Sequence, residues 1–134
     1  MPACDSKDWN MKLVVVRDGR PSETQLSFVN VRILFGLITG EVHYSGAKVS
    51  ELRGLCLPGN NASHMSFWFG LPGVEILLVG MAVEYEERDV RFDGMFRAFE
   101  PRAGVPTKRV AALPDVGETG TGNGNQAQNL NKPR

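Results

Sequence analysis

The chain is short of the residues that usually carry chemistry. Its 134 residues include only two cysteines, Cys4 and Cys56, and two histidines, His43 and His64. No C-x-x-C, H-x-H or H-E-x-x-H spacing occurs, and such paired spacings are typical of zinc sites. The one glycine-rich stretch follows no predicted strand and opens no helix, so it does not fit a nucleotide-binding loop. The sequence therefore predicts no metal and no cofactor.

Net charge and long apolar runs are also lacking. Lysine plus arginine and aspartate plus glutamate both number 15, so no overall field attracts nucleic acid or an anionic membrane. No stretch approaches the roughly 20 apolar residues that a transmembrane helix needs. Nothing at the N-terminus resembles a signal peptide, which predicts a cytoplasmic protein, neither secreted nor transmembrane, with both cysteines as free thiols.

The central stretch, residues 65–99, offers the most surface to bury. Residues 76–83 form the longest apolar run, and residues 74–85 read as a strand that is apolar on both faces. Two-sided burial predicts a central strand that is covered on each side. Residues 88–97 alternate more cleanly and predict a half-exposed partner strand.

The rest of the chain predicts short strands, turns and one helix. A β-branched run at residues 11–17 ends at Asp18-Gly19, and a strand at residues 39–44 ends at Ser45-Gly46; both pairs read as turns. Residues 22–35 are ambiguous: β-branched content favours a strand, whereas the Ser22 cap favours a helix, and we expect the helix. The predicted fold is α+β, a mostly antiparallel sheet of five or six short strands with one or two helices.

The composition changes toward the C-terminus. Gly, Asn and Gln dominate residues 115–134, and such a segment cannot offset the entropy of ordering. The predicted organisation is therefore a flexible N-terminus at residues 1–10, one α+β domain at residues 11–110 and a disordered tail at residues 111–134.

Two catalytic readings are weaker than their structural alternatives. A Cys56–His64 pair would need a third group to orient the histidine, and a buried cysteine beside an exposed loop histidine is the simpler interpretation. Glu84 and Glu86 lie on one strand face at a spacing compatible with a glycosidase pair, but a solvated strand end and hairpin turn is the simpler and favoured explanation. The sequence predicts a protein that is not an enzyme.

Aromatic and basic residues are the better candidates for contact sites. In a strand, Trp68 points opposite to Phe67 and Phe69, so the three form either core or an apolar contact surface for self-association. Basic residues form two groups that suit the phosphates of a nucleic-acid backbone; these are Arg17, Arg20 and Arg32, and Arg102, Lys108 and Arg109.

The order of these features resembles a known family. A strand at residues 12–16 runs into Arg17-Asp18-Gly19-Arg20-Pro21 and Thr24; later come Leu55-Cys56-Leu57-Pro58, Phe67, Gly73 and a strand at residues 76–85 with an acidic exit. This succession is similar to the core of matrix proteins of non-segmented negative-strand RNA viruses, of the rhabdovirus and bornavirus kinds. The N-terminus departs from the family in being nearly neutral, and budding motifs of the P-P-x-Y or P-T-A-P type are absent.

The resemblance implies a structural protein of the virion. Such a protein self-associates, contacts an anionic membrane surface and a viral nucleoprotein or RNA, and acts in assembly and budding, in the virion and at the inner membrane face of the host cytoplasm. It takes no small-molecule substrate. The alternative from the residues themselves is a small β-rich domain that binds an apolar ligand in a pocket near residues 67–69.

Overall fold

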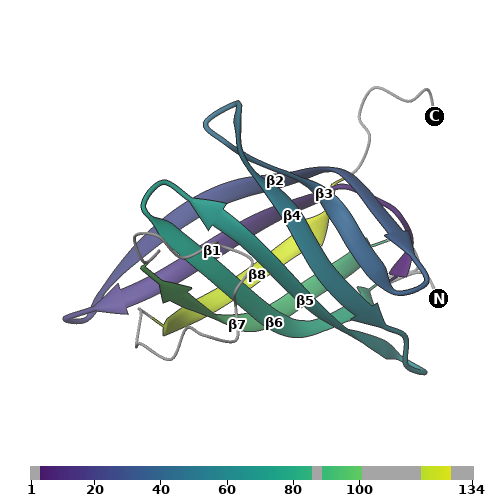
Figure 1. Cartoon of the computed structure of the whole chain (residues 1–134). Helices are drawn as coiled ribbons and strands as arrows, with labels where there is room; N and C mark the ends of the chain where they lie inside the picture. The colour runs from purple at the N-terminus through teal and green to yellow at the C-terminus, as the bar shows by residue number, and fades with distance from the viewer. Residues whose placement is uncertain (1–3, 86–88, 101–118, 128–134) are drawn as a thin grey trace.

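The structure is a closed antiparallel barrel of eight strands. The computed structural model describes residues 4–85, 89–100 and 119–127. The strands are β1 (Trp9–Arg17), β2 (Arg20–Leu34), β3 (Leu37–Tyr44), β4 (Ala47–Leu57), β5 (Ala62–Leu71), β6 (Val74–Tyr85), β7 (Asp89–Phe99) and β8 (Thr119–Gln126). Each strand pairs with the next in sequence, and β8 returns to pair with β1, so no sheet edge remains open (Figure 1).

The α+β prediction is therefore wrong. The described residues contain no α-helix, and so none of them forms a helix long and apolar enough to cross a membrane.

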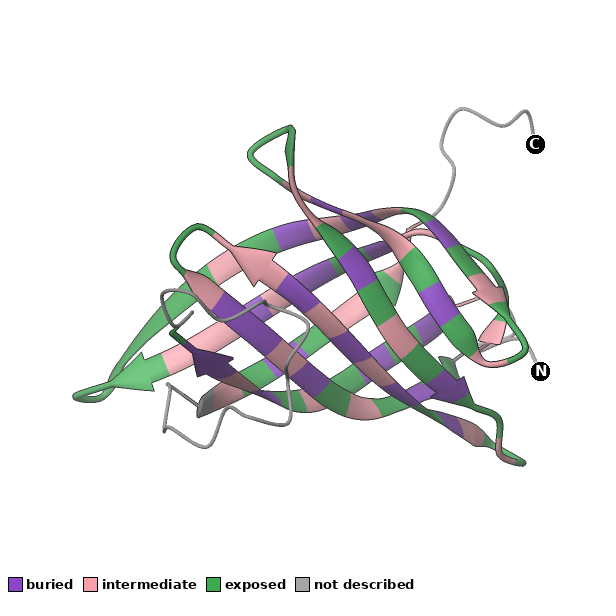
Figure 2. Ribbon diagram, in the orientation of Figure 1, coloured by how far each residue is buried: buried purple, intermediate pink, exposed green. Residues whose placement is uncertain are grey.

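Period-two alternation builds the barrel. In β1, Trp9, Met11 and Leu13 are at most 3% exposed, whereas the intervening residues are half-buried or exposed. Figure 2 shows the same alternation of buried and exposed bands along most strands. One apolar core thus fills the interior, and the outward residues decide what the surface can bind.

The segment predicted as a helix, residues 22–35, is strand β2. Its inward residues are Leu26, Phe28 and Val31, and the register with β3 shifts between Val29 and Arg32. Asn30, in the bulge, has φ +55°. This bulge inserts one residue, so the inward spacing changes from two to three and imitates part of a helical pattern.

Part of the predicted disordered tail is strand β8. Its sequence TGTGNGNQ pairs with β1 over six positions and with β7 over seven. Its glycines alternate and lie against large inward side chains of the neighbouring strands: Gly120 beside Phe96, and Gly124 beside Met11. The glycines thus allow β8 to pack closely against its neighbours, and β8 closes the barrel.

Two-residue turns join three of the first four strand pairs. Asp18-Gly19, Phe35-Gly36 and Ser45-Gly46 all have positive φ at both positions, which is the geometry of type I′ hairpin turns. The turns predicted at Asp18-Gly19 and Ser45-Gly46 are confirmed.

Candidate functional site

Five aromatic rings occupy the centre of the barrel. Trp9, Phe28, Phe67, Phe69 and Phe92 are each at most 1% exposed. The ring of Phe67 lies 5.0 Å from that of Phe28, 5.3 Å from that of Phe92 and 6.3 Å from that of Trp9, measured between centroids. We call these five residues the aromatic cluster. Tilted and edge-to-face contacts of this kind add to the stability gained from burial.

Three polar side chains are buried beside the aromatic cluster without a hydrogen-bond partner. They are the indole N–H of Trp9, the hydroxyl of Ser63 and the carboxamide of Gln126. Ser63 and Trp9 are 0% exposed. Buried polar groups in folded proteins are almost always hydrogen-bonded, so three unpaired groups in one barrel interior need an explanation.

Strand register brings the three groups to one end of the interior. Trp9 pairs directly with Gln126 across β1 and β8. The Trp9 ring lies 6.4 Å from the ring of Phe92. Phe92 pairs with Ala82, and Ala82 pairs with Ser63. We call this region, defined by Trp9, Ser63 and Gln126, the polar end of the barrel.

Residues 4–8 lie across the strands near this end. Cys4 forms a disulfide with Cys56 of β4. The backbone N–H of Val31 donates to Asp8 Oδ1 over 3.2 Å, and that of Ile33 donates to Ser6 Oγ over 2.8 Å. The Asp8 carbonyl accepts from the N–H of Ala127, just beyond Gln126, over 2.7 Å. The segment therefore holds β2, β4 and the end of β8 together.

Chemically, the three side chains of the polar end can hydrogen-bond to a polar group. The indole N–H can only donate, whereas the hydroxyl and the carboxamide can both donate and accept. No described His, Cys, Asp or Glu residues form a cluster of three or more that could hold a metal ion.

The three aromatic residues predicted as a contact surface are divided between two sides of the sheet. Phe67 and Phe69 point inward and belong to the aromatic cluster. Trp68 points outward, half-buried, with its ring 6.1 Å from that of Phe99. Only Trp68 of the three can therefore contribute to an outer contact.

The predicted basic groups do not come together. Arg17 and Arg20 face each other at the β1–β2 turn, but Arg32 lies twelve residues further along β2, roughly 40 Å away for an extended strand. Lys108 and Arg109 lie outside the described residues. The arginines thus form no single patch for phosphate or lipid head groups.

Cys56 cannot act as a nucleophile in this structure, because its sulfur is bonded to Cys4. The prediction of free thiols is wrong. His64 is exposed on the outer face of β5. Glu84 is exposed near the end of β6, and Glu86 lies outside the described residues.

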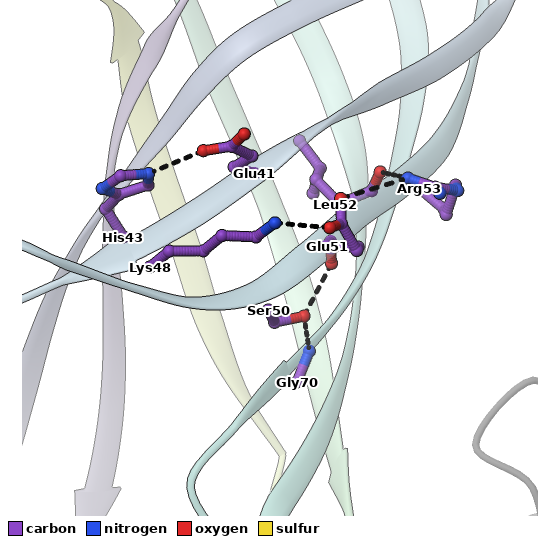
Figure 3. Close-up of polar contacts among 8 residues, drawn as sticks. All are labelled: Glu41, His43, Lys48, Ser50, Glu51, Leu52, Arg53 and Gly70. Atoms are coloured by element: carbon purple, nitrogen blue, oxygen red, sulfur yellow. Dashed lines mark hydrogen bonds and ion pairs between the residues drawn. The ribbon is translucent and has the colours of Figure 1, made fainter.

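Charged residues concentrate on the outer face of β3 and β4 (Figure 3). Glu41 Oε1 lies 3.0 Å from His43 Nε2, and this hydrogen bond lowers the pKa of Glu41 below its usual value. Lys48 donates to Glu51 Oε1, which raises the pKa of Lys48. These side chains are solvated, and such exposed pairs contribute little to stability. We assign them no site.

Glu75 is a buried exception, only 8% exposed. Its carboxylate lies near Gly70, whose missing side chain leaves room for it and for the hydroxyl of Ser50. Burial raises the pKa of Glu75. No cation partners it among the described residues.

Comparison of the chain with protein-family models, with characterised proteins and with solved structures gives no match. No family is shown. The resemblance to matrix proteins receives no support from these comparisons and stays a prediction.

Sequence reasoning did not single out Ser63 or Gln126. The alternation of inward and outward residues could have identified Ser63, whereas Gln126 also required residues 119–126 to be recognised as a strand. Ser63 is two residues before Met65 in a strand whose odd-numbered positions are otherwise apolar, and Gln126 continues the alternation of Gly120, Gly122 and Gly124. The missing signal was the recognition that residues 119–126 form a strand.

Proposed function

We propose that this protein is a non-catalytic binding module that holds one small, uncharged ligand at the polar end of the barrel. The observation that carries the proposal is the group of three unpaired polar side chains on β1, β5 and β8, buried beside the aromatic cluster. An eight-stranded barrel is wide enough to enclose side chains or one small ligand. Small-molecule sites typically combine apolar walls with a few convergent polar groups.

The side chains of the polar end define the ligand class. The Trp9 N–H requires an acceptor on the ligand, and a carbonyl oxygen fits this requirement. Gln126 and Ser63 can pair with both the N–H and the C=O of an amide. Because Trp9, Ser63 and Gln126 are all uncharged, burial of a charged ligand group against them would be costly. A neutral amide with an apolar ring is the simplest match.

The structure does not have the two features on which the matrix-type hypothesis depended. That hypothesis implied an α+β fold, whereas the chain is an all-β barrel, and its arginines are far apart. Membrane, nucleoprotein and RNA partners stay predictions.

Tryptophan fluorescence tests the proposal directly. In the variant Trp68→Phe, Trp9 is the only tryptophan, so its emission reports on the polar end. Titration with benzamide and caprolactam, two neutral amides with an apolar ring, is expected to shift or quench this emission saturably. Native mass spectrometry of the purified wild-type protein is expected to show one ligand per chain.

The variant Ser63→Ala is expected to weaken binding about tenfold, the effect of one lost hydrogen bond of ~1.4 kcal/mol. The matched control is Ser66→Ala, because Ser66 lies on the outer face of the same strand. If neither amide changes the emission and no small molecule accompanies the native protein, the three groups are hydrated by buried water, and the proposal fails.

A further inference from the structure

The outer face of β6 does not follow the pattern of a solvated barrel. Its outward residues are Leu77, Val79, Met81 and Val83, and the last three are 51%, 41% and 43% exposed. In an antiparallel sheet with one packed face, the other face is normally polar. A strand that is apolar on both faces therefore lacks a cover on its outer side.

Register extends this apolar surface across five strands. Leu37 pairs with Leu55, Leu55 with Ser66, Ser66 with Val79, and Val79 with Met95. We call this line of outward residues the apolar row. Its four apolar members are 49% to 67% exposed. With Leu57, Leu77, Met81 and Val83 on either side, the patch measures roughly 20 Å by 20 Å, a size that marks interaction surfaces.

The opposite side of the barrel is polar. A shallow groove of about 1060 Å³ crosses the outer surface of β1, β2, β7 and β8. Its outward side chains are amides, hydroxyls and charges, among them Asn10, Lys12, Gln25, Asn123 and Asn125. The groove is thus polar, whereas the apolar row crosses a different part of the outer surface, next to the charged residues of β3 and β4.

We propose that a second copy of this chain covers the β6–β7 part of the apolar row in a two-fold symmetric dimer. An isologous interface requires a surface that is complementary to itself. The apolar row bends around the closed barrel, so a straight two-fold axis can follow it only over neighbouring strands. Along β6 and β7 such an axis places Val79 and Met95 each opposite its own copy, and it exchanges the residues two positions before and after them.

On β7 this exchange matches opposite charges. Asp93 and Arg97 flank Met95 by two residues on the same outer face. The axis therefore puts Asp93 against Arg97 of the partner subunit, and the contact occurs twice. On β6 the same operation puts Leu77 against Met81 of the partner subunit. On these two strands charge meets opposite charge, and apolar side chains meet apolar side chains.

Arg97 has no carboxylate partner in the part of the chain that the structure describes. Its Nε has no hydrogen-bond partner, and its guanidinium lies 5.9 Å from the centre of the Phe99 ring. Neither Asp93 nor Arg97 forms an ion pair within the described residues. A patch for an anionic membrane would instead collect cations, and here the two charges cancel. This dimer is independent of the ligand site, which lies inside the barrel.

Charge exchange tests the geometry. Sedimentation velocity of the wild-type protein is expected to give a species of twice the 14.7 kDa chain mass. Asp93→Arg alone and Arg97→Asp alone each place like charges together twice, and each is expected to raise the dimer Kd by roughly 10- to 100-fold. The double variant restores opposite charges and is expected to return the Kd to near the wild-type value.

A cysteine at the axis gives a second measurement. Because both native cysteines are bonded to each other, Met95→Cys introduces one free thiol, and two copies would meet at the axis. Mild oxidation is expected to yield a covalent dimer, whereas Gln25→Cys, on the polar side, is expected to stay monomeric. Circular dichroism melting of every variant establishes that the barrel is folded.

Three results would overturn the dimer. The first is a wild-type protein that is monomeric at all concentrations tested. The second is a double charge exchange that fails to restore association. The third is a monomer that binds phosphatidylcholine vesicles and loses that binding in Val79→Lys, which would make the apolar row a lipid-contact surface.

Discussion

At the scale of single residues, the buried polar groups are the costly positions of this barrel. Ser63 contributes a hydroxyl at 0% exposure with no partner, next to a cluster that is otherwise aromatic. Groups that lower stability but persist at one place are often retained for function. The free protein should therefore gain stability when such a group is removed.

Ser63→Ala provides that test. Removal of a buried, unpaired hydroxyl is expected to raise the free energy of unfolding by about 1 kcal/mol, measured by urea denaturation of ligand-free protein. Ser66→Ala, on the outer face of β5, is expected to change it by less than ~0.5 kcal/mol. A loss of stability in Ser63→Ala would mean that the hydroxyl has a partner in the free protein.

Glu75 predicts a pH dependence at the same scale. Burial raises its pKa in the folded state above the usual value of 4.5, so the folded protein binds this proton more tightly than the unfolded chain does. The resulting contribution to stability is fully present below the unfolded pKa and is lost as pH rises through the folded pKa.

Glu75→Gln is expected to remove that loss. Chemical denaturation from pH 4 upward should show wild-type stability falling relative to the variant, with the variant more stable at neutral pH. Glu23→Gln, at an exposed position, should leave the difference from wild type almost constant with pH. Equal pH profiles for wild type and Glu75→Gln would show that the carboxylate is well solvated.

At the scale of elements, the predictions succeeded or failed according to how clearly each segment shows the period-two alternation or the turn residues of a β-hairpin. Turns with Asp18-Gly19 and Ser45-Gly46 could be predicted, because their backbone demands φ values that few other residue pairs adopt. The helix over residues 22–35 was wrong because the bulge at Asn30 interrupts the period-two pattern, and the Ser22 cap then seemed more specific. β-branched content was the better guide.

Strand β8 could not be predicted from its own composition. Thr119–Gln126 has almost no apolar surface, and its order comes from pairing with β1 and β7 on both sides. Its glycines are required because large side chains of neighbouring strands fill the space beside them. The polar end of the barrel was missed for the same reason, since it depends on Gln126.

Gly124→Ala tests this account of β8. An added Cβ would meet the Met11 sulfur and, at 2.6 Å, the Asn10 carbonyl oxygen. The expected loss of stability is about 1–3 kcal/mol, as for other overpacking substitutions. Asn125→Ala, exposed on the same strand, is expected to be nearly neutral. If thermal melting showed Gly124→Ala to be stabilised, β8 would not press against β1 as described.

At the scale of the whole molecule, the chain closes in two ways. Strand β8 joins β1 and completes the barrel, and the Cys4–Cys56 disulfide ties the N-terminal segment to β4 across 52 residues of sequence. The sequence had suggested free thiols, because nothing in its pattern indicated an oxidising compartment. Pairing depends on residues 4–8 crossing the barrel, which sequence pattern does not reveal.

The disulfide should therefore govern both stability and the polar end of the barrel. A loop of this length is expected to contribute about 2–4 kcal/mol to the free energy of unfolding, chiefly by restricting the unfolded chain. Urea denaturation with and without a phosphine reductant measures the loss. The double variant Cys4→Ala/Cys56→Ala should have the stability of the reduced wild type, and its stability should not change when the reductant is added.

Residues 4–8 also fix Asp8, whose carbonyl accepts a hydrogen bond from the N–H of Ala127 beside Gln126. Reduction should thus alter the Trp9 emission of Trp68→Phe well below the unfolding transition, and an unchanged emission would separate the segment from the polar end.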